Sequence, residues 1–403
     1  MPFSDIVRAV EDQFHRDSIP VLRRRGWRPR VIPYPGYGSA APESSSGSAA
    51  VGSSGTSTNR PSPARADDGG PRDMARVLAR MVMRPPNAPS EGPLFQRLPE
   101  ELPATPQALG RQAAESLLEA QRGWRMFIDV PVPHLPVTVR LGAMSVRTRA
   151  DREGYVDVVV RGHGLASGWH EATLEAAGAV AVTTRVLVVA PGPRLGIVCD
   201  IDDTVMVSHV PRMFVAAWNQ LVKHTSSREA VPGMAQLLTG VQEQHPGAPV
   251  IYLSTGAWNV VPTYRSFFER NGFPEGPMLM TDWGPTNTGL FRSGIEHKRT
   301  GLRRLMIDLP EVKWLLVGDD GQHDPLIYGE AAREHSDRVA AVAIRRLSPT
   351  EQVLAGTQLT HPAGLAPEAR ALAESGVPVA VGADGFELAR SLSPEVFAAR
   401  LRR

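Results

Sequence analysis

The second half of the chain alternates short apolar runs with segments of helical spacing. The apolar runs have few polar interruptions and cover residues 195–199, 250–253, 314–317 and 339–344. Helical spacing lies between them, for example over 299–307 and 326–335. Near-continuous apolar strands with helical crossovers are typical of a parallel sheet that helices cover on both faces. We therefore predict an α/β domain over residues 193–403, closed by a strand at 377–381 and a helix at 385–391.

A different pattern, of short β-rich runs separated by turn residues, occupies residues 124–192. The runs cover residues 125–128, 137–141, 155–160 and 183–189. Several short strands at this spacing favour a small antiparallel sandwich. The segment carries no cluster of side chains suited to catalysis. We interpret it as an accessory domain of β-sandwich type that precedes the α/β domain.

The N-terminal part of the chain shows neither the alternation of strands and helices nor the series of short β-rich runs. Residues 1–35 begin with helical spacing and continue into a cluster of arginines, which either contacts anionic lipid headgroups or is a solvated arm. Residues 36–72 are dominated by Ser, Gly, Ala and Pro, and are predicted to be a disordered linker because they cannot bury enough apolar surface. Residues 73–123 are interpreted as a connector, helical over 73–84 and extended where proline is frequent.

Composition narrows the class of protein only slightly. The chain of 403 residues has a net charge of +2, which gives no support for a nucleic-acid-binding protein. Its single cysteine, Cys199, excludes an internal disulfide and a cysteine-based zinc site, and fits a reducing compartment. No apolar run approaches the roughly 18 residues that span a bilayer. We expect a cytoplasmic protein, and contact with the inner membrane surface stays open.

Candidate chemistry lies where the apolar strands end. Asp200, Ser254 and Asp319 each directly follow or end one of these strands. Because ligands bind at the carboxyl ends of parallel strands, neighbouring strands would bring these side chains to one edge of the sheet. We therefore expect a single polar site built from three distant parts of the chain.

Two carboxylates stand close together at the first strand end. Asp200 and Asp202 are separated by Ile201, so both can face one pocket while Ile201 points into the core. Such a pair repels unless a proton or cation lies between the groups, and a hard divalent cation such as Mg²⁺ fits oxygen ligands best. Thr204 could orient Asp200 or its loop. The competing interpretation is a capped turn, since Asp and Thr are common where strands end.

Four motifs in the same order resemble those of the haloacid dehalogenase superfamily of phosphatases. They are Asp200-Ile201-Asp202-Asp203-Thr204, Ser254 after an apolar strand, Lys298, and the acidic run from Gly318 to Asp324. A narrower resemblance, to the App1-type phosphatidate phosphatase family, covers roughly residues 124–346. It rests on the stretches Tyr252 to Asn259, Thr281-Asp282-Trp283-Gly284 and Gly318 to Pro325.

The chain departs from the family pattern at two places. Thr255-Gly256-Ala257 stands where the family usually has serines followed by proline. Asp320 stands where the family usually has a small polar residue. Neither change removes a catalytic group, but both leave the substrate preference open.

The resemblance implies a fold and a mechanism. The fold would be a haloacid-dehalogenase-like Rossmannoid sheet domain. Asp200 would attack phosphorus and form an aspartyl-phosphate, while Asp202 would protonate the leaving oxygen and later take a proton from water. Ser254 and Lys298 would hold the phosphoryl oxygens, with Thr204 and Thr255 as further substrate contacts.

The resemblance also implies a Mg²⁺ site. Asp200, the main-chain carbonyl of Asp202, and Asp319 would hold the ion. Asp324 would assist them, and the sequence permits Asp320 in that role as well; the family pattern favours Asp324.

Three functions remain open at this point. The first is hydrolysis of a lipid phosphate such as phosphatidate, which suits a site covered only by the connection over residues 205–247. The second is hydrolysis of a soluble sugar or nucleotide phosphate with the same residues. The third is a non-catalytic binding protein on the same fold, against which the complete set of motif residues argues.

Overall fold

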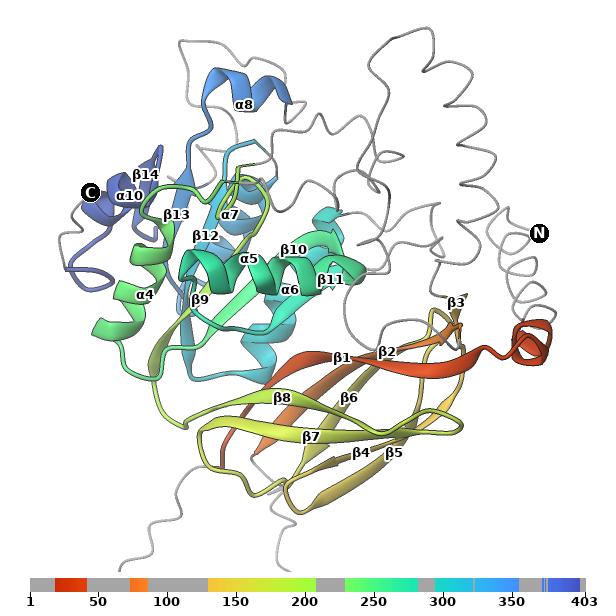
Figure 1. Ribbon diagram of the computed structural model, residues 1–403. Coiled ribbons are helices and arrows are strands. Elements are labelled where there is room, and N and C mark those ends of the chain that lie inside the picture. The colour runs from red at the N-terminus through yellow and green to blue at the C-terminus, as the bar shows by residue number, and fades with distance from the viewer. Residues whose placement is uncertain are drawn as a thin grey trace, which may run out of the picture.

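The structure is a computed structural model, and it describes residues 19–41, 73–85, 130–207, 229–281, 294–321, 323–354, 372, 374 and 376–398. Within these ranges the chain forms a curled sheet and a parallel sheet (Figure 1). Several sequence predictions lie outside the described residues: the helical start of the chain, most of the 36–72 linker, the extended part of the 73–123 connector, the strand at 125–128, and all but the first residue of the stretch Thr281-Asp282-Trp283-Gly284. No described helix is long and apolar enough to cross a membrane.

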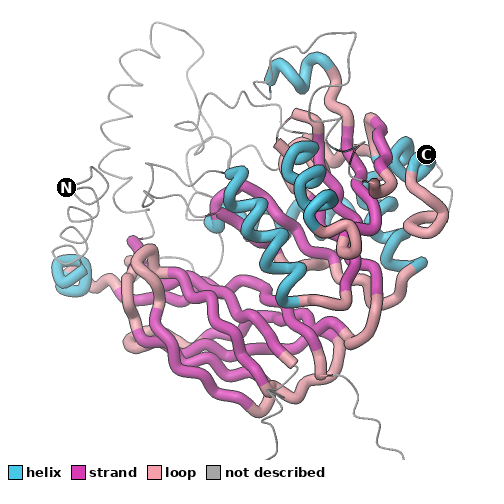
Figure 2. The backbone as a smooth tube through the Cα atoms, turned by 180° about the vertical axis from the view of Figure 1, so that it is seen from behind, coloured by secondary structure: helices cyan, strands magenta, loops and turns pink. Residues whose placement is uncertain are grey.

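The curled sheet joins eight strands in one hydrogen-bonded array. They are β1 (Arg28–Ser39), β2 (Met74–Arg84), β3 (Val130–Pro131), β4 (Pro136–Leu141), β5 (Met144–Arg149), β6 (Tyr155–Arg161), β7 (Gly168–Ala176) and β8 (Val182–Val189). The order is β3-β2-β1-β8-β7-β4-β5, and β6 also pairs with β2. Neighbours are antiparallel except β1 and β8, which are parallel. The pairing joins these strands into a single curled sheet, and the predicted sandwich is not confirmed (Figure 2).

The predicted helix over 73–84 is wrong, because Met74–Arg84 is strand β2. Its Met, Ala, Leu and Arg residues favour a helix when they are taken alone. The strand pairs with β1 along one side and with β6 and β3 along the other, and nearly all of its residues are buried. Tertiary pairing on both sides therefore overrides the local preference.

The predicted linker is wrong at its start, because Gly36 to Ser39 belong to β1. The glycines of this strand permit a close approach to β2. A side chain at Gly38 would place its Cβ 2.6 Å from the Cα of Ala75, which real contacts do not allow. The proline- and glycine-rich composition therefore marks a tightly packed strand, and the curled sheet starts at residue 28 instead of 124.

The parallel sheet confirms the predicted α/β part of the fold. Its strands are β9 (Arg194–Cys199), β10 (Val250–Ala257), β11 (Met278–Thr281), β12 (Val312–Asp319), β13 (Val339–Arg345) and β14 (Val379–Gly382). The helices are α4 (Met234–Gln244), α5 (Val261–Asn271), α6 (Gly294–Asp308), α7 (Asp324–Glu334), α8 (Pro349–Leu354) and α10 (Gly385–Ser391), with a 3₁₀ turn η4 (Trp258–Val260). Helices lie on both faces of the sheet (Figures 1 and 2). The predicted last strand and helix are β14 and α10.

The strand order of this sheet determines where a ligand can bind. The order is β11-β10-β9-β12-β13-β14, with every neighbouring pair parallel. Successive connections run outward from β9 in one direction and from β12 in the other. In open sheets of this kind, ligands bind beyond the carboxyl ends of the strands at the point where the order reverses. That point lies between β9 and β12.

The two sheets share a buried interface. The ring of Trp258 in η4 lies 4.3 Å from that of Tyr34 in β1 and 6.2 Å from that of Tyr155 in β6, measured between centroids. Asp308, the last residue of α6, accepts hydrogen bonds from Tyr37 Oη at 2.8 Å and from Arg76 Nε at 2.9 Å. Apolar residues of the curled sheet and of the parallel sheet therefore belong to one continuous core.

Candidate active site

A buried cluster of three carboxylates lies at the reversal point of the parallel sheet. Asp200 follows β9, Asp319 ends β12, and Asp324 begins α7. One carboxylate oxygen from each can be chosen so that all three lie within 4.8 Å of one another. All three residues are buried. The sheet thus brings together Asp200 and Asp319, as the strand-end pattern predicted, and the first turn of α7 adds Asp324.

Lys298 on α6 places an ammonium group among these carboxylates. Its Nζ lies 2.9 Å from Asp200 Oδ1 and 2.5 Å from Asp324 Oδ1, and the side chain is buried. Three carboxylates and one ammonium group leave the cluster short of positive charge when all are ionised. Burial of uncompensated charge is costly, so a proton or a further cation must neutralise the cluster.

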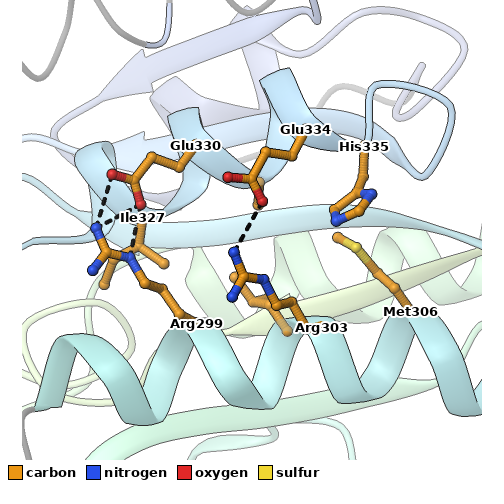
Figure 3. Close-up of a pocket in the computed structure, with 9 residues that line it drawn as sticks. Arg299, Arg303, Met306, Ile327, Glu330, Glu334 and His335 are labelled. Carbon is orange, nitrogen blue, oxygen red and sulfur yellow. Dashed lines mark hydrogen bonds and ion pairs between the residues drawn. The ribbon is translucent and has the colours of Figure 1, made fainter.

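Ion pairs between α6 and α7 hold Lys298 opposite Asp324. Arg299 donates to both oxygens of Glu330 at 2.7 and 2.8 Å, and Arg303 Nη2 lies 3.1 Å from Glu334 Oε2 (Figure 3). The pocket between these helices has none of the clustered aspartates in its lining. It therefore lies outside the candidate active site, and the ion pairs that line it join α6 to α7.

The electrostatics of the cluster follow from its burial. Burial raises the pKa of Asp200 from 3.8 to about 7; Lys298 opposes this rise, whereas Asp324 adds to it. Burial, with repulsion from Asp324 and Asp200, raises the pKa of Asp319 well above its ordinary value. For Lys298, burial alone would lower the pKa, but attraction to Asp200, Asp324 and Asp319 raises it above its ordinary value. The ammonium group therefore stays charged, and the carboxylates are the groups that need neutralising.

The cluster has the donor set of a hard-cation site. Asp324 Oδ2 is buried and has no hydrogen-bond partner within the described part of the chain. Such an orphaned carboxylate oxygen is costly unless an ion or water meets it. Gly318 contributes to the arrangement, because a Cβ there would collide with the Asp324 carboxylate. Oxygen ligands of this kind suit Mg²⁺ better than a softer metal.

The loop after Asp200 is fixed by hydrogen bonds. The buried Thr204 hydroxyl lies 3.4 Å from Asp200 Oδ2 and 3.3 Å from Asp319 Oδ2, which favours an orienting role over substrate contact. Asp203 has a φ of 60°, an uncommon conformation for a residue with a side chain. Arg345, at the end of β13, donates from Nη1 to the carbonyl oxygen of Asp203 at 2.6 Å and thereby secures that turn.

Asp202 differs from its neighbours in being partly exposed. Its carboxylate accepts a hydrogen bond from the Tyr264 hydroxyl, which lies 2.9 Å from Oδ2 and 3.1 Å from Oδ1. Asp202 is not a member of the three-carboxylate cluster. Asp200 and Asp202 therefore lie in different environments. Asp200 is buried against Lys298, and Asp202 is partly exposed to solvent.

The last residues of β10, from Ser254 onward, bring a second polar motif to the carboxyl edge of the parallel sheet. The Ser254 side chain is buried, and its Oγ accepts a hydrogen bond from Gly256 N–H at 2.9 Å. Thr255 is partly exposed. Trp258, which follows β10, packs against the curled sheet through its ring contacts with Tyr34 and Tyr155.

The structure separates the two candidates for the assisting carboxylate. Asp320 Oδ1 accepts a hydrogen bond from Leu347 N–H at 2.8 Å, beside the end of β13. It is not among the three clustered carboxylates, whereas Asp324 is. The geometry therefore favours Asp324. His323, which directly precedes α7, is exposed.

Two residues of the site were not identified from the sequence. Arg345 directly follows the apolar run 339–344, so the strand-end rule that selected Asp200 and Asp319 would have selected it too. Tyr264 had no such signal, because it lies on the buried face of α5 among apolar residues. Only the packing of α5 against the loop after β9 shows its contact with Asp202.

Comparison with known proteins places this geometry in a family context. Residues 195–346 match the family model for the catalytic domain of the phosphatidate phosphatase APP1. The Phosphatidate phosphatase APP1 from Saccharomyces cerevisiae is 24% identical over 154 residues, which are 38% of this chain and 26% of the relative. An uncharacterized protein from Schizosaccharomyces pombe, C29B5.04c, is 26% identical over 155 residues, 38% of this chain and 25% of its own.

The chain thus spans about a quarter of the length of the curated relatives that it matches. Among solved structures, a carbohydrate acetylesterase from Xanthomonas citri aligns over 62% of both chains at 11% identity, but the TM-score of 0.26 carries no argument about fold. The matched segment contains every motif residue of the site described above. The match supports the motif resemblance: residues 195–346 are similar to the catalytic domain of the phosphatidate phosphatase APP1.

Proposed function

We propose that this protein is a Mg²⁺-dependent phosphatase of the haloacid dehalogenase superfamily that hydrolyses a phosphomonoester through an aspartyl-phosphate. One observation carries the proposal: three buried carboxylates and one lysine meet where the order of the parallel sheet reverses. The group is short of positive charge, and it lies in the segment that matches the APP1 catalytic domain. A cluster with these properties suits the binding of a divalent cation beside a nucleophilic carboxylate.

The proposed reaction has two displacements at phosphorus, the first by Asp200 and the second by water. Asp200 forms a bond to phosphorus through a carboxylate oxygen while the bond from phosphorus to the leaving oxygen breaks. Asp202, the more exposed of the pair, gives its proton to that leaving oxygen. Water then attacks phosphorus and gives a proton to Asp202, and the bond from Asp200 to phosphorus breaks. Orthophosphate leaves, and both carboxyl groups return to their starting states.

Other residues of the site bind and orient the phosphoryl group. Ser254 and Lys298 hold phosphoryl oxygens, and Lys298 also keeps Asp200 in place through its 2.9 Å ion pair. Asp200, Asp319, Asp324 and the main-chain carbonyl of Asp202 would hold Mg²⁺. Bound there, the ion supplies positive charge that offsets the negative charge of the phosphoryl group.

We propose a lipid phosphate of the phosphatidate type as the substrate. The support is the name of the Saccharomyces cerevisiae relative, which is 24% identical over the catalytic segment. The assignment implies peripheral contact with a membrane surface, where such a substrate lies, and a cytoplasmic location of the enzyme. A soluble phosphomonoester would use the same residues, so the experiment includes both classes.

Phosphate release from defined substrates tests the function. We expect the full chain to release phosphate from vesicles containing phosphatidate, to lose this activity with EDTA, and to regain it with added Mg²⁺. Glucose 6-phosphate and a nucleoside monophosphate serve as soluble comparisons. Faster hydrolysis of the soluble esters would overturn the lipid assignment, and no phosphate release from any of these substrates with Mg²⁺ present would overturn the phosphatase itself.

Thermal unfolding tests the metal site without relying on turnover. The folded-state pKa of Asp200 is raised from 3.8 to about 7, so the metal-free folded protein binds more protons than the unfolded chain between these values. Its stability should therefore fall as pH rises through this window, by an amount on the order of a few kcal/mol. Added Mg²⁺ should raise Tm by several degrees more at about pH 8 than at about pH 5, where protons already neutralise the cluster.

The control for this measurement is Na⁺ at matched ionic strength, which should raise Tm little at either pH. An equal effect of Mg²⁺ at both pH values would contradict a site built on the clustered carboxylates. So would an Asp319→Asn variant with the full Mg²⁺ response, because that variant lacks one of the three.

A further inference from the structure

Tyr264 contacts Asp202, the one aspartate of the first motif that is partly exposed. It is the fourth residue of α5, is buried, and has its ring in the shared apolar core. Its hydroxyl lies 2.9 Å from Asp202 Oδ2 and 3.1 Å from Oδ1, so the phenol donates to the carboxylate. A buried ring has little freedom to move, and the hydroxyl is therefore a fixed point for the partly exposed Asp202 side chain.

The same hydroxyl lies near the C-terminal end of β10, which carries Ser254. A Cβ built on Gly256 would lie 3.3 Å from Tyr264 Oη and 3.2 Å from Ser254 Oγ. Gly256 N–H in turn donates to Ser254 Oγ. The Tyr264 hydroxyl is thus close both to the Asp202 carboxylate and to the strand end whose Ser254 is proposed to hold a phosphoryl oxygen.

The Tyr264 hydroxyl is a hydrogen-bond donor, and a carboxyl oxygen is an acceptor. Because the hydroxyl lies close to both oxygens of Asp202, at 2.9 and 3.1 Å, it restricts the orientation of the carboxyl group. Lys298 cannot have this function for Asp202, since its ion pairs are with Asp200 and Asp324.

We propose that Tyr264 is a positioning residue that holds the Asp202 carboxyl group for proton transfer to the leaving oxygen. The inference rests on the proposed phosphatase function and adds a residue that the motifs do not contain. It also explains why α5 presents a tyrosine at this buried position, where phenylalanine would fill the same apolar space. The observations that carry it are the two short distances to Asp202 and the closeness of the hydroxyl to Gly256 at the end of β10.

The choice of leaving group offers a direct test, because only a poor leaving group must be protonated before it departs. Tyr264→Phe should lower kcat for dioctanoyl phosphatidate, whose alkoxide must be protonated, while KM changes little. General-acid catalysis contributes roughly 10²- to 10⁴-fold, and loss of positioning alone should cost about tenfold or more. With p-nitrophenyl phosphate, whose leaving group departs without a proton, the same variant should lose less than about threefold.

Tyr252→Phe is the matched control. It also removes one hydroxyl from a buried tyrosine, but that hydroxyl donates to the carbonyl oxygen of Pro274 at 2.7 Å and has no contact with Asp202. We expect its activity on both substrates to match that of the unaltered protein. A second comparison uses Asp202→Asn, in which Tyr264→Phe should cause no additional loss, because residues acting as a unit are not additive.

Each outcome decides the inference. Equal losses on both substrates, or no loss on phosphatidate, would overturn the positioning role while the phosphatase function stands. Additive losses in the Asp202→Asn background would overturn it as well. If the unaltered protein hydrolyses neither substrate, the proposed function fails and this inference fails with it. Tm values for Tyr264→Phe and Tyr252→Phe show whether either variant is unfolded at the assay temperature; should Tyr264→Phe unfold there, the same comparison at a lower temperature decides.

Discussion

Asp200→Asn should lower phosphate release by at least about 10³-fold, because an amide cannot act as the nucleophile. The substitution keeps the size of the side chain and removes one of the three buried negative charges. It leaves Asp324 to pair with Lys298 at 2.5 Å. The fold should therefore persist. The measurements are initial rates on phosphatidate vesicles, circular dichroism of the variant, and acid-quench trapping of a phosphorylated protein, which only the unaltered chain should yield.

Asp320→Asn is the comparison for this variant, since it makes the same change nearby. Its amide oxygen can still accept the hydrogen bond from Leu347 N–H that the Asp320 carboxylate accepts now. Because Asp320 lies outside the three-carboxylate cluster, the activity of Asp320→Asn should fall by no more than about tenfold. Near-full activity of Asp200→Asn would reject the nucleophile assignment. A larger loss in Asp320→Asn than in Asp324→Asn would instead reassign the carboxylate that assists the metal.

Lys298→Met should destabilise the metal-free protein by about 3–5 kcal/mol near pH 8, since it leaves buried carboxylates without their cation. Methionine fills similar space but cannot offset the charge of Asp200 and Asp324. The penalty should shrink toward pH 5, where protons can neutralise the cluster instead. Activity should fall as well, by roughly 10²- to 10³-fold, because a donor to the phosphoryl oxygens is lost. Urea unfolding at both pH values, followed by far-UV circular dichroism, measures the stability effect.

Lys313→Met is the matched control for this prediction. Lys313 is an exposed residue of β12, so the same chemical change there should alter stability by no more than about 0.5 kcal/mol. A Lys298→Met variant as stable as this control at both pH values would contradict the view that Lys298 compensates buried charge. Equal destabilisation at the two pH values would point to a packing defect and away from electrostatics.

The core of the parallel sheet could be predicted from the sequence for a physical reason. Strands buried on both faces must be apolar throughout, and the runs at 195–199, 314–317 and 339–344 lie within β9, β12 and β13. A polar residue that interrupts such a run marks the end of the strand. Because parallel strands all end at one edge, this simple rule places Asp200 and Asp319 together before any contact is known.

The remaining features depend on contacts that one segment cannot reveal. Strand β2 has helix-favouring composition, and only its partners on both sides make it a strand. The contact of Tyr264 with Asp202 joins residues 62 positions apart, and no spacing rule connects them. The curl of the eight-stranded sheet likewise depends on the parallel pairing of β1 with β8, which lie far apart in the chain.

The aromatic contact between Trp258 and the curled sheet bears on the integrity of the catalytic unit. The family match covers residues 195–346, which include Trp258 but not its ring partners Tyr34 and Tyr155. Trp258 begins the turn that immediately precedes α5, the helix whose tyrosine meets Asp202. Excision at the family boundaries would uncover an indole ring and leave Asp308 without its Tyr37 and Arg76 partners. We therefore expect the matched segment to be less stable alone than in the full chain, and the two sheets to melt together.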